Sequence, residues 1–328
     1  MHVIARWMKS AQSVAPALVF TVGMLVSGAA AAEYPERIIK GVVPFPPGGG
    51  TDIFARLAAT HVGKVLGQTM IIENRPGAEG NIAMDHVAKS LPDGYTILFN
   101  SSAATVNPAI YRSLPFDPIK DLQPVAVLCE YPNLIVVNAA KVPVSTLPEF
   151  MDLLRKNPGK YNAAAGGTHI VYELFKLQNN VDVLIVPYKG AGDAITGLLS
   201  GQVDFMIVNA PGLTGHIETG KLRALAITAA ERHPDFPAVP TTREAGMPEF
   251  VYGSFFGAYV RGGTPPEIMQ KLNDAFNKVT SMPEVMERFR SLGATATQKS
   301  LADASALYVG DIARIKDVVK RANIPTRD

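Results

Sequence analysis

The sequence contains little cysteine and little tryptophan. Its 328 residues include a single cysteine, Cys129, and a single tryptophan, Trp7. One cysteine excludes an intramolecular disulfide, so the fold must depend on packing. Cys129 directly follows the apolar run "VAVL". This context favours a small core residue, and a free reactive thiol is the alternative.

Long apolar runs are absent after the first 32 residues. Residues 1–32 carry Arg6 and Lys9, then an apolar stretch, and end in Ala30–Ala32, which is the layout of a secretory signal peptide. The stretch is shorter than the roughly 20 residues of a spanning helix, so an uncleaved anchor is the less favoured alternative. Cleavage after Ala32 would place the protein in the periplasm and leave 296 of the 328 residues.

Excess charge of one sign is also lacking. The chain has 31 Lys and Arg against 29 Asp and Glu, and two of the basic residues lie within residues 1–32. The mature chain therefore has a formal net charge of zero. This argues against a nucleic-acid partner and against electrostatic binding to a membrane surface.

The common catalytic and cofactor motifs are missing. A dinucleotide fingerprint that begins at Gly48 would need glycine where Ile53 stands, and no phosphate loop is present. There is neither a G-x-S-x-G elbow nor an H-E-x-x-H pair. The histidines are scattered, and Asp52 fits a first helical turn better than a general base. We expect no enzyme activity, no metal and no cofactor.

Strands and helices alternate along the first part of the chain. Residues 37–45, 69–74 and 95–100 have the pattern of strands, and residues 52–66 and 80–90 have that of helices. This β-α-β-α-β order predicts a parallel sheet with helical crossovers.

A second α/β unit is predicted after a crossing at Tyr131-Pro132-Asn133, which separates two apolar runs. The alternation then begins again, and a return crossing is predicted at residues 252–260. We therefore expect one domain of residues 33–130 plus 253–328 and another of residues 131–252. Two such units would enclose a ligand cleft at the carboxyl ends of their strands.

The loop that ends the first strand has the composition of an anion site. Gly48, Gly49 and Gly50 allow close approach to the backbone, and Pro44, Pro46 and Pro47 stiffen the loop. Thr51 or Gly50 could cap the following helix and leave its first N–H groups free. No lysine or arginine lies between Gly41 and Ala55, so main-chain dipoles would hold the anion.

Five segments together resemble one family. They are "YPERIIKGVVPFPPGGGTDIFAR", "IIENRPGAEGNIAMDHVAKSLPDGYTILF", "NPAIYRSLPFDPIKDLQPVAVL", "VPYKGAGDAITGLLSGQVDFMI" and "GKLRALAIT…PAVPTTREAGMPEF". The chain resembles the Bug-type substrate-binding proteins of the tripartite tricarboxylate transporter family from Tyr34 to about Ile324. The resemblance implies an α/β, two-domain type II periplasmic-binding-protein fold, each domain a mainly parallel sheet flanked by helices. It also implies a carboxylate ligand in the interdomain cleft and delivery to membrane permease subunits.

The resemblance also implies the ligand-binding residues. In the first domain they lie in the loop after the first strand and in the segment after the third strand, for which a plain turn is the alternative. In the second domain they lie in "VPYKGAGDA" and at the end of "VDFMIVNA". The residues are Phe45, Pro46, Gly48, Gly49, Gly50, Asp52, Ser101, Ser102, Thr105, Tyr188, Gly190, Ala191, Gly192 and Asn209.

One loop departs from the family pattern. "YNAAAGGTHIVYELF" is about two residues shorter than usual and has alanine in place of the leading hydroxyl. Gly166, Gly167, Thr168 and His169 are the remaining candidates there. We expect a less polar far end of the cleft and hence an aromatic or less polar carboxylate. A monomer is expected. The alternatives to transport are signalling to a membrane sensor kinase and, less favoured, catalysis on a carboxylate.

Overall fold

The structure is a computed structural model that describes residues 34–48, 50–165, 170–188, 191–209, 213–229, 231–234, 236–250 and 252–327. The predicted signal peptide, residues 1–32, lies outside the described residues. Tyr34–Asp328 form one compact unit by their contacts.

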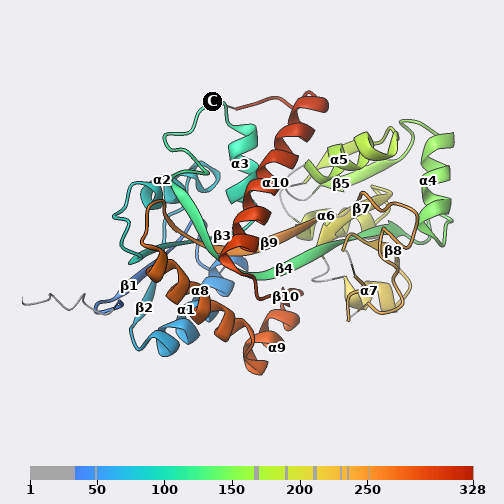
Figure 1. The fold of residues 1–328 in the computed structure, drawn as a ribbon. Coiled ribbons are helices and arrows are strands. Elements are labelled where there is room, and N and C mark those ends of the chain that lie inside the picture. Colours follow the sequence, from blue (N-terminus) through green and yellow to red (C-terminus); the bar gives the residue numbers. More distant parts are fainter. Residues whose placement is uncertain are drawn as a thin grey trace, which may run out of the picture. The chain divides into compact units, whose positions relative to one another are not determined.

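Within the described residues, ten strands form one connected sheet in the order β2-β1-β3-β9-β4-β7-β5-β6, with β8 and β10 both paired to β4 (Figure 1). We call β1, β2, β3, β9 and β10 the β1 side of the sheet, and β5, β6, β7 and β8 the β7 side. The strands are β1 (Ile39–Val43), β2 (Met70–Asn74), β3 (Thr96–Asn100), β4 (Leu122–Asn138), β5 (Asn162–Ala165), β6 (Leu184–Pro187), β7 (Phe205–Asn209), β8 (Leu222–Ile227), β9 (Gly253–Arg261) and β10 (Thr295–Ala296).

Helices connect most of these strands. They are α1 (Gly50–Leu66), α2 (Asn81–Ala88) after the short 3-10 helix η1 (Ala78–Gly80), α3 (Ala103–Ile110), α4 (Leu147–Lys156), α5 (Ile170–Asn179), α6 (Ala191–Leu199), α7 (Thr214–Glu218), α8 (Pro266–Thr280), α9 (Pro283–Ser291) and α10 (Leu301–Arg321). The predicted alternation is confirmed in both parts of the chain, whereas β10 was not predicted.

The β1 side begins as the expected parallel sheet. β1 pairs in parallel with β2 and with β3, so the carboxyl ends of all three strands meet at one edge. Helix α1 buries Phe54, Ala55, Ala58 and Val62 in the core of this side. Their spacing of three and four residues places them on one helix face.

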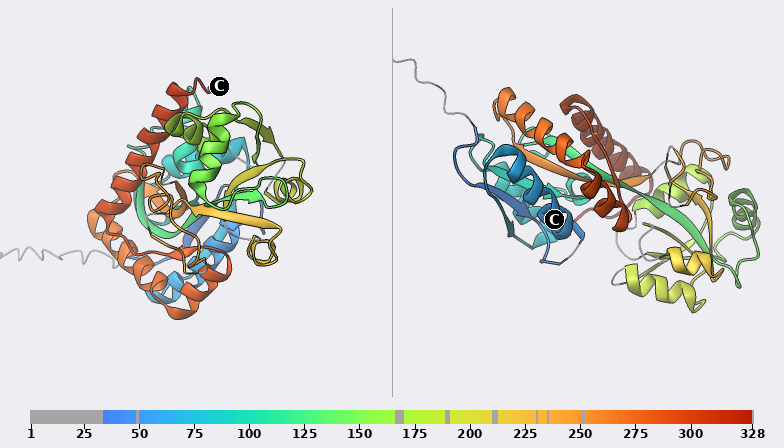
Figure 2. Two further views of the ribbon diagram at one scale, coloured as in Figure 1. Left: turned by 90° about the vertical axis from the view of Figure 1, so that its right-hand side faces the viewer. Right: turned by 90° about the horizontal axis from the view of Figure 1, so that it is seen from below.

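Strand β4 connects the two sides. Its first part, Leu122–Pro132, pairs with β9, and its second part, Asn133–Asn138, pairs with β7 and β8. In Figure 2 the long green strand passes from the blue elements around β1 to the yellow-green elements around β7. The predicted crossing at Tyr131-Pro132-Asn133 therefore lies inside one continuous strand.

The sheet is mixed rather than uniformly parallel. β5 pairs in parallel with β6 and β7, but every pairing of β4 and β9 is antiparallel. β4 and β9 run antiparallel because β4 leads the chain to the β7 side and β9 returns it to the β1 side. The predicted domain boundaries near residues 131 and 252 stay a prediction.

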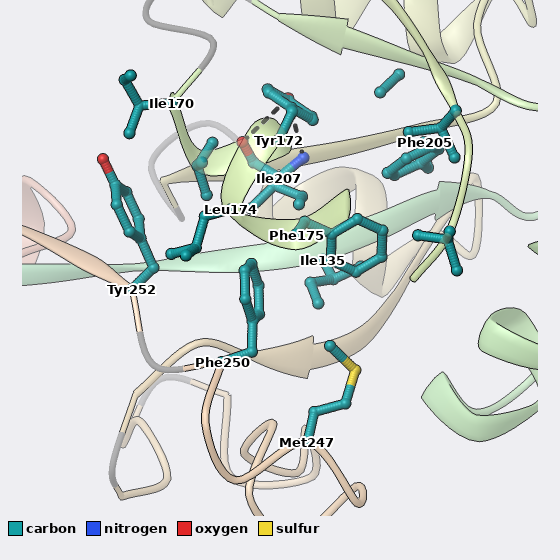
Figure 3. Packing of buried hydrophobic residues seen from close by; sticks show 14 of the residues in the cluster. Ile135, Ile170, Tyr172, Leu174, Phe175, Phe205, Ile207, Met247, Phe250 and Tyr252 are labelled. Carbon is teal, nitrogen blue, oxygen red and sulfur yellow. Dashed lines mark hydrogen bonds between the residues drawn. The ribbon is translucent and has the colours of Figure 1, made fainter. Parts of the chain in front are cut away.

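The core of the β7 side includes aromatic and aliphatic side chains from β4, β7, α5 and the segment before β9 (Figure 3). Phe175 packs edge-on against Phe250, with ring centroids 5.4 Å apart. The buried Tyr172 hydroxyl donates to Ala164 O at 2.5 Å and accepts from Ile207 N at 3.1 Å. This hydroxyl is satisfied, as a buried polar group must be to avoid a large penalty.

Helix α10 packs against both sides. Ala304, Tyr308 and Ile312 belong to a cluster with β3 and β9 residues, whereas Ile315 and Val318 belong to the core of the β7 side. Within the described part of the chain, no helix is both long and apolar enough to cross a membrane.

Candidate functional site

The loop between β1 and α1 is held in place by the carboxylate of Asp52. Gly48 donates its N–H to Asp52 Oδ2 at 2.9 Å. Gly48 has φ +84°, which side chains other than glycine rarely adopt. α1 begins at Gly50, so Thr51 lies inside the first turn and does not cap it. Gly50 is exposed, and the N–H groups of a first helical turn have no partner within the helix.

Asp52 is only 3 % exposed and accepts further hydrogen bonds. Arg56 Nε lies 3.0 Å from both carboxylate oxygens, and Asn74 Nδ2 donates to Oδ1 at 2.9 Å. Burial alone would raise the pKa of Asp52, but the hydrogen bonds from Arg56, Gly48 and Asn74 outweigh it and lower the pKa. The carboxylate is therefore ionised and engaged in holding the loop. Its predicted ligand contact stays a prediction.

Asn74 is a loop-holding residue that the sequence analysis missed. It also donates to Phe45 O at 2.9 Å and accepts from Arg56 Nη2 at 2.9 Å. It ends β2 directly beside Val43, the last residue of β1. Its position at the carboxyl end of a neighbouring parallel strand could have indicated this role, because polar side chains there lie close to the loops.

A cavity of 340 Å³ adjoins the first turn of α1. We call it the α1 cavity; its lining is Gly50, Thr51, Ile53, Phe54, Tyr131, Asn209 and Leu292. Gly50 and Asn209, both predicted from the sequence, lie in this one cavity, although they come from the β1 side and the β7 side. Asn209 ends β7 and stands opposite Asn133 in the antiparallel pairing with β4.

The walls of the α1 cavity are mainly apolar. The rings of Phe54 and Tyr131 are nearly parallel, with centroids 6.4 Å apart. Burial raises the pKa of Tyr131, so the phenol stays neutral. Ile53 and Phe54 lie in the predicted helix of residues 52–66, and Tyr131 lies in the predicted crossing. Leu292 lies far away in the sequence, so no local signal could place it here.

A second cavity of 550 Å³ adjoins α3. We call it the α3 cavity; its lining is Phe45, Glu79, Ser101, Ser102, Ala103, Val106, Asn107, Ile110, Ile170, Glu173, Ala322, Asn323, Ile324, Pro325 and Arg327. It brings together the predicted residues Phe45, Ser101 and Ser102. Its charged groups are paired, because Arg327 binds Glu79 and Glu173 lies 3.4 Å from Lys176.

The structure buries Thr105. Residues Ala103–Ile110 form a helix, and within it Thr105 is 0 % exposed. Its hydroxyl donates to Ser102 O at 3.1 Å. Of the three predicted hydroxyls, Ser101 and Ser102 line the α3 cavity, and the ligand contact of Thr105 stays a prediction.

The predicted residues before α6 have different surroundings. The Tyr188 ring lies against Gly197 of α6, and its hydroxyl donates to Gln202 Oε1 at 3.4 Å, so its side chain supports the helix. Ala191 and Gly192 are exposed in the first turn of α6, and Pro46 is exposed in the first loop. Gly49, Gly166, Gly167, Thr168, His169 and Gly190 lie outside the described residues.

A third cavity, of 680 Å³, is larger but contains none of the predicted ligand residues. It lies along α10 beside β4 and β9. Glu130 pairs with Lys299 at 3.0 Å, and Asp311 pairs with Arg314. Of the charged lining residues, Glu130, Asp311 and Arg314 therefore have partners within the protein.

The thiol of Cys129 is the remaining candidate reactive group. Cys129 is fully buried, and burial raises the pKa of its thiol, so it is a core residue as the sequence favoured. In the described ranges, no group of three or more His, Cys, Asp and Glu side chains could hold a metal ion.

The chain is similar to the receptors of one transporter family over most of its length. Residues 54–324 match the family described as "Tripartite tricarboxylate transporter family receptor". "Protein BugT" of Bordetella pertussis (strain Tohama I) is 38 % identical over 296 residues, which cover 88 % of this chain and 90 % of that protein.

Two solved structures of similar proteins hold carboxylates. "R. palustris Rpa4515 with adipate" is 34 % identical, with a TM-score of 0.73, and covers 90 % of this chain and 100 % of its own. "MatC (Rpa3494) from Rhodopseudomonas palustris with bound malate" is 35 % identical, with a TM-score of 0.69, and covers 87 % and 100 %. This chain shares their α/β, two-domain periplasmic-binding-protein fold.

Proposed function

This chain belongs to the tripartite tricarboxylate transporter receptor family, and we propose that it captures a small carboxylate in the periplasm and delivers it to the permease subunits of such a transporter. The carboxylate ligands of two relatives support this function. The observation that carries the proposal is the α1 cavity, which has Gly50 of the β1 side and Asn209 of the β7 side in one lining.

The proposed ligand contacts are main-chain amides of the first turn of α1 and the amide side chain of Asn209. One exposed helix N-terminus contributes about 0.3–1 kcal/mol, and about 2 kcal/mol when partly buried. Micromolar affinity needs about 8 kcal/mol. Several donors from both sides of the sheet must therefore act together, in a cavity that closes and excludes water. The predicted residues Phe45, Pro46, Ser101, Ser102, Ala191 and Gly192 are further candidates for such contacts.

Binding without turnover is the expected activity. The family consists of receptors, and Asp52, the acidic side chain nearest the loop, is ionised and engaged with Gly48, Arg56 and Asn74. A general base would need a free carboxylate within reach of its substrate. We propose a monomeric receptor.

Substitution of Gly50 tests this function. A Cβ built at Gly50 meets no heavy atom within 4 Å, so side chains fit there without disturbing the fold. Gly50→Asp should abolish the stabilisation by carboxylates, because a second negative charge would stand where the ligand binds. Gly50→Asn, of the same shape but without charge, should bind at least about tenfold more tightly than Gly50→Asp, and Gly50→Ala should stay closest to wild type.

The measurement is thermal unfolding with a panel that includes adipate, malate and monocarboxylates, followed by calorimetry. A ligand at 100 times its Kd should stabilise the folded protein by about 2.7 kcal/mol. The proposal fails if no carboxylate stabilises the protein, or if Gly50→Asp binds as tightly as wild type. Deleting the gene and measuring both carboxylate uptake and the transcriptional response separates transport from signalling through a sensor kinase.

A further inference from the structure

We propose that the solute of this receptor is a monocarboxylate whose remaining part is apolar, rather than a dicarboxylate. The inference rests on the proposed function and specifies its substrate class. It follows from the side chains that form the walls of the α1 cavity.

None of the seven described residues that line the α1 cavity carries a charge. Ile53, Phe54 and Leu292 are apolar, and Tyr131 contributes an aromatic ring. Among these described residues, polar side chains come only from Thr51, Tyr131 and Asn209. A carboxylate bound at the first turn of α1 would therefore leave the rest of the ligand against apolar walls.

These walls cannot readily rearrange to present polar groups. Phe54 is 9 % exposed and packs against Phe256 and Phe289, with ring centroids 5.5 Å and 5.3 Å apart. The Tyr131 ring packs against the same core, with its centroid 6.4 Å from that of Phe54. Interiors packed in this way resist changes in shape, so the apolar character of the cavity is a fixed property.

The neighbouring α3 cavity does not supply a cation for a second carboxylate. The one basic side chain in its described lining is Arg327, which binds Glu79. Glu173 in that lining is also paired, with Lys176 at 3.4 Å. A dicarboxylate that extended from one cavity into the other would meet paired or like charges.

A second carboxylate would therefore be removed from water without a partner. Burying an unpaired ionised group is far more unfavourable than burying a neutral polar group. A methyl or phenyl end in the same place instead gains about 25 cal/mol per Å² of apolar surface removed from water. The cavity volume of 340 Å³ is near the lower end of the usual range for small-molecule sites, about 300–1,000 Å³.

The test compares hexanoate with adipate, which have the same chain length and differ by the second carboxylate. Calorimetry and thermal unfolding of the wild-type protein should show that hexanoate binds at least about tenfold more tightly. Phenylacetate should also bind more tightly than adipate. Equal or tighter binding of adipate overturns this inference while the proposed function stands. Absence of binding by all three probes and by malate overturns both.

A variant tests whether the walls set this preference. Leu292 is half-buried at the C-terminal end of α9, where a cation is favourable to the helix dipole. Leu292→Lys should lower the ratio of hexanoate to adipate affinity at least about tenfold, because the ammonium can pair with the second carboxylate. The control is Leu91→Lys, at a position 71 % exposed, which should leave the ratio unchanged. An unchanged ratio in Leu292→Lys would place the ligand elsewhere.

Discussion

The α1 cavity and the α3 cavity differ in chemistry. Tyr131 lines the first and Ser101 the second. Among the described lining residues, the α1 cavity has none with a charge, whereas the α3 cavity has Arg327 paired with Glu79. Because Arg327 is paired with Glu79, a ligand carboxylate would be bound by main-chain and side-chain amide donors and not by a side-chain cation.

The charged residues around the first loop have a positioning role instead. Asp52 and Arg56 bind each other, and Asn74 connects both to Phe45 O. This network fixes the main chain whose amides would bind the ligand. The difference between the cavities indicates that the charged side chains near this site hold the backbone in position and do not bind the ligand. Three substitutions test that conclusion.

The largest effect is expected from Asp52→Asn. Its amide cannot accept all the hydrogen bonds from Gly48, Arg56 and Asn74, so the loop loses its position. Carboxylate affinity should fall by more than about 100-fold, and the free energy of unfolding by about 1–3 kcal/mol. Calorimetry and urea unfolding measure the two. Asp93→Asn, at an exposed pair with Arg37, is the control and should cost less than about 1 kcal/mol.

The same variant has a distinct pH dependence. The pKa of Asp52 is lowered in the folded protein, so its stabilising contribution is complete above the unfolded pKa, about 3.9, and is lost as the pH falls through the lower folded pKa. Unfolding free energies between pH 5 and pH 2.5 should therefore fall less steeply for Asp52→Asn than for wild type. Parallel curves would contradict the assigned network.

An intermediate effect is expected from Asn209→Leu. This change keeps the approximate size of the side chain and removes one amide donor from the α1 cavity. A hydrogen bond to a charged group contributes about 1.5–3 kcal/mol, so hexanoate affinity should fall about tenfold or more. Asn179→Leu, which loses a bond to Phe175 O on α5, is the control for an amide elsewhere. Unchanged affinity in Asn209→Leu would remove the β7 side from ligand recognition.

The smallest effect is expected from Arg327→Met. The Arg327–Glu79 pair is about half exposed on both partners, so its loss should change unfolding by at most about 1 kcal/mol. Hexanoate affinity in calorimetry should change by less than about twofold. A tenfold loss of carboxylate affinity would move the anion site into the α3 cavity and reverse the comparison between the cavities.

Much of the fold could be predicted from the sequence because its signals are local. The apolar spacing of α1 and the β-branched run of β1 depend on residues a few positions apart. The glycine-rich loop was also recognised locally, and Gly48 indeed has a positive φ. The burial of Thr105 was not foreseen, because its segment was not predicted to be helical and it forms helix α3.

Local patterns could not predict which distant residues lie beside the first loop and the α1 cavity. Asn74, Tyr131 and Leu292 reach the site from β2, β4 and the end of α9. No pattern of a few residues connects them to Gly50, since only the register of the sheet and the packing of α9 against α1 place them together.

The sequence by itself determined most of the order of strands and helices, the glycine- and proline-rich composition of the first loop and the family, because these depend on local patterns and on residues in a fixed order. Only the tertiary structure decided that Asp52 holds the loop and that the cavity beside it is apolar. The physical reason is that a side chain's role follows from its burial and its partners, and those come from segments up to some 240 positions apart, as Gly50 and Leu292 are.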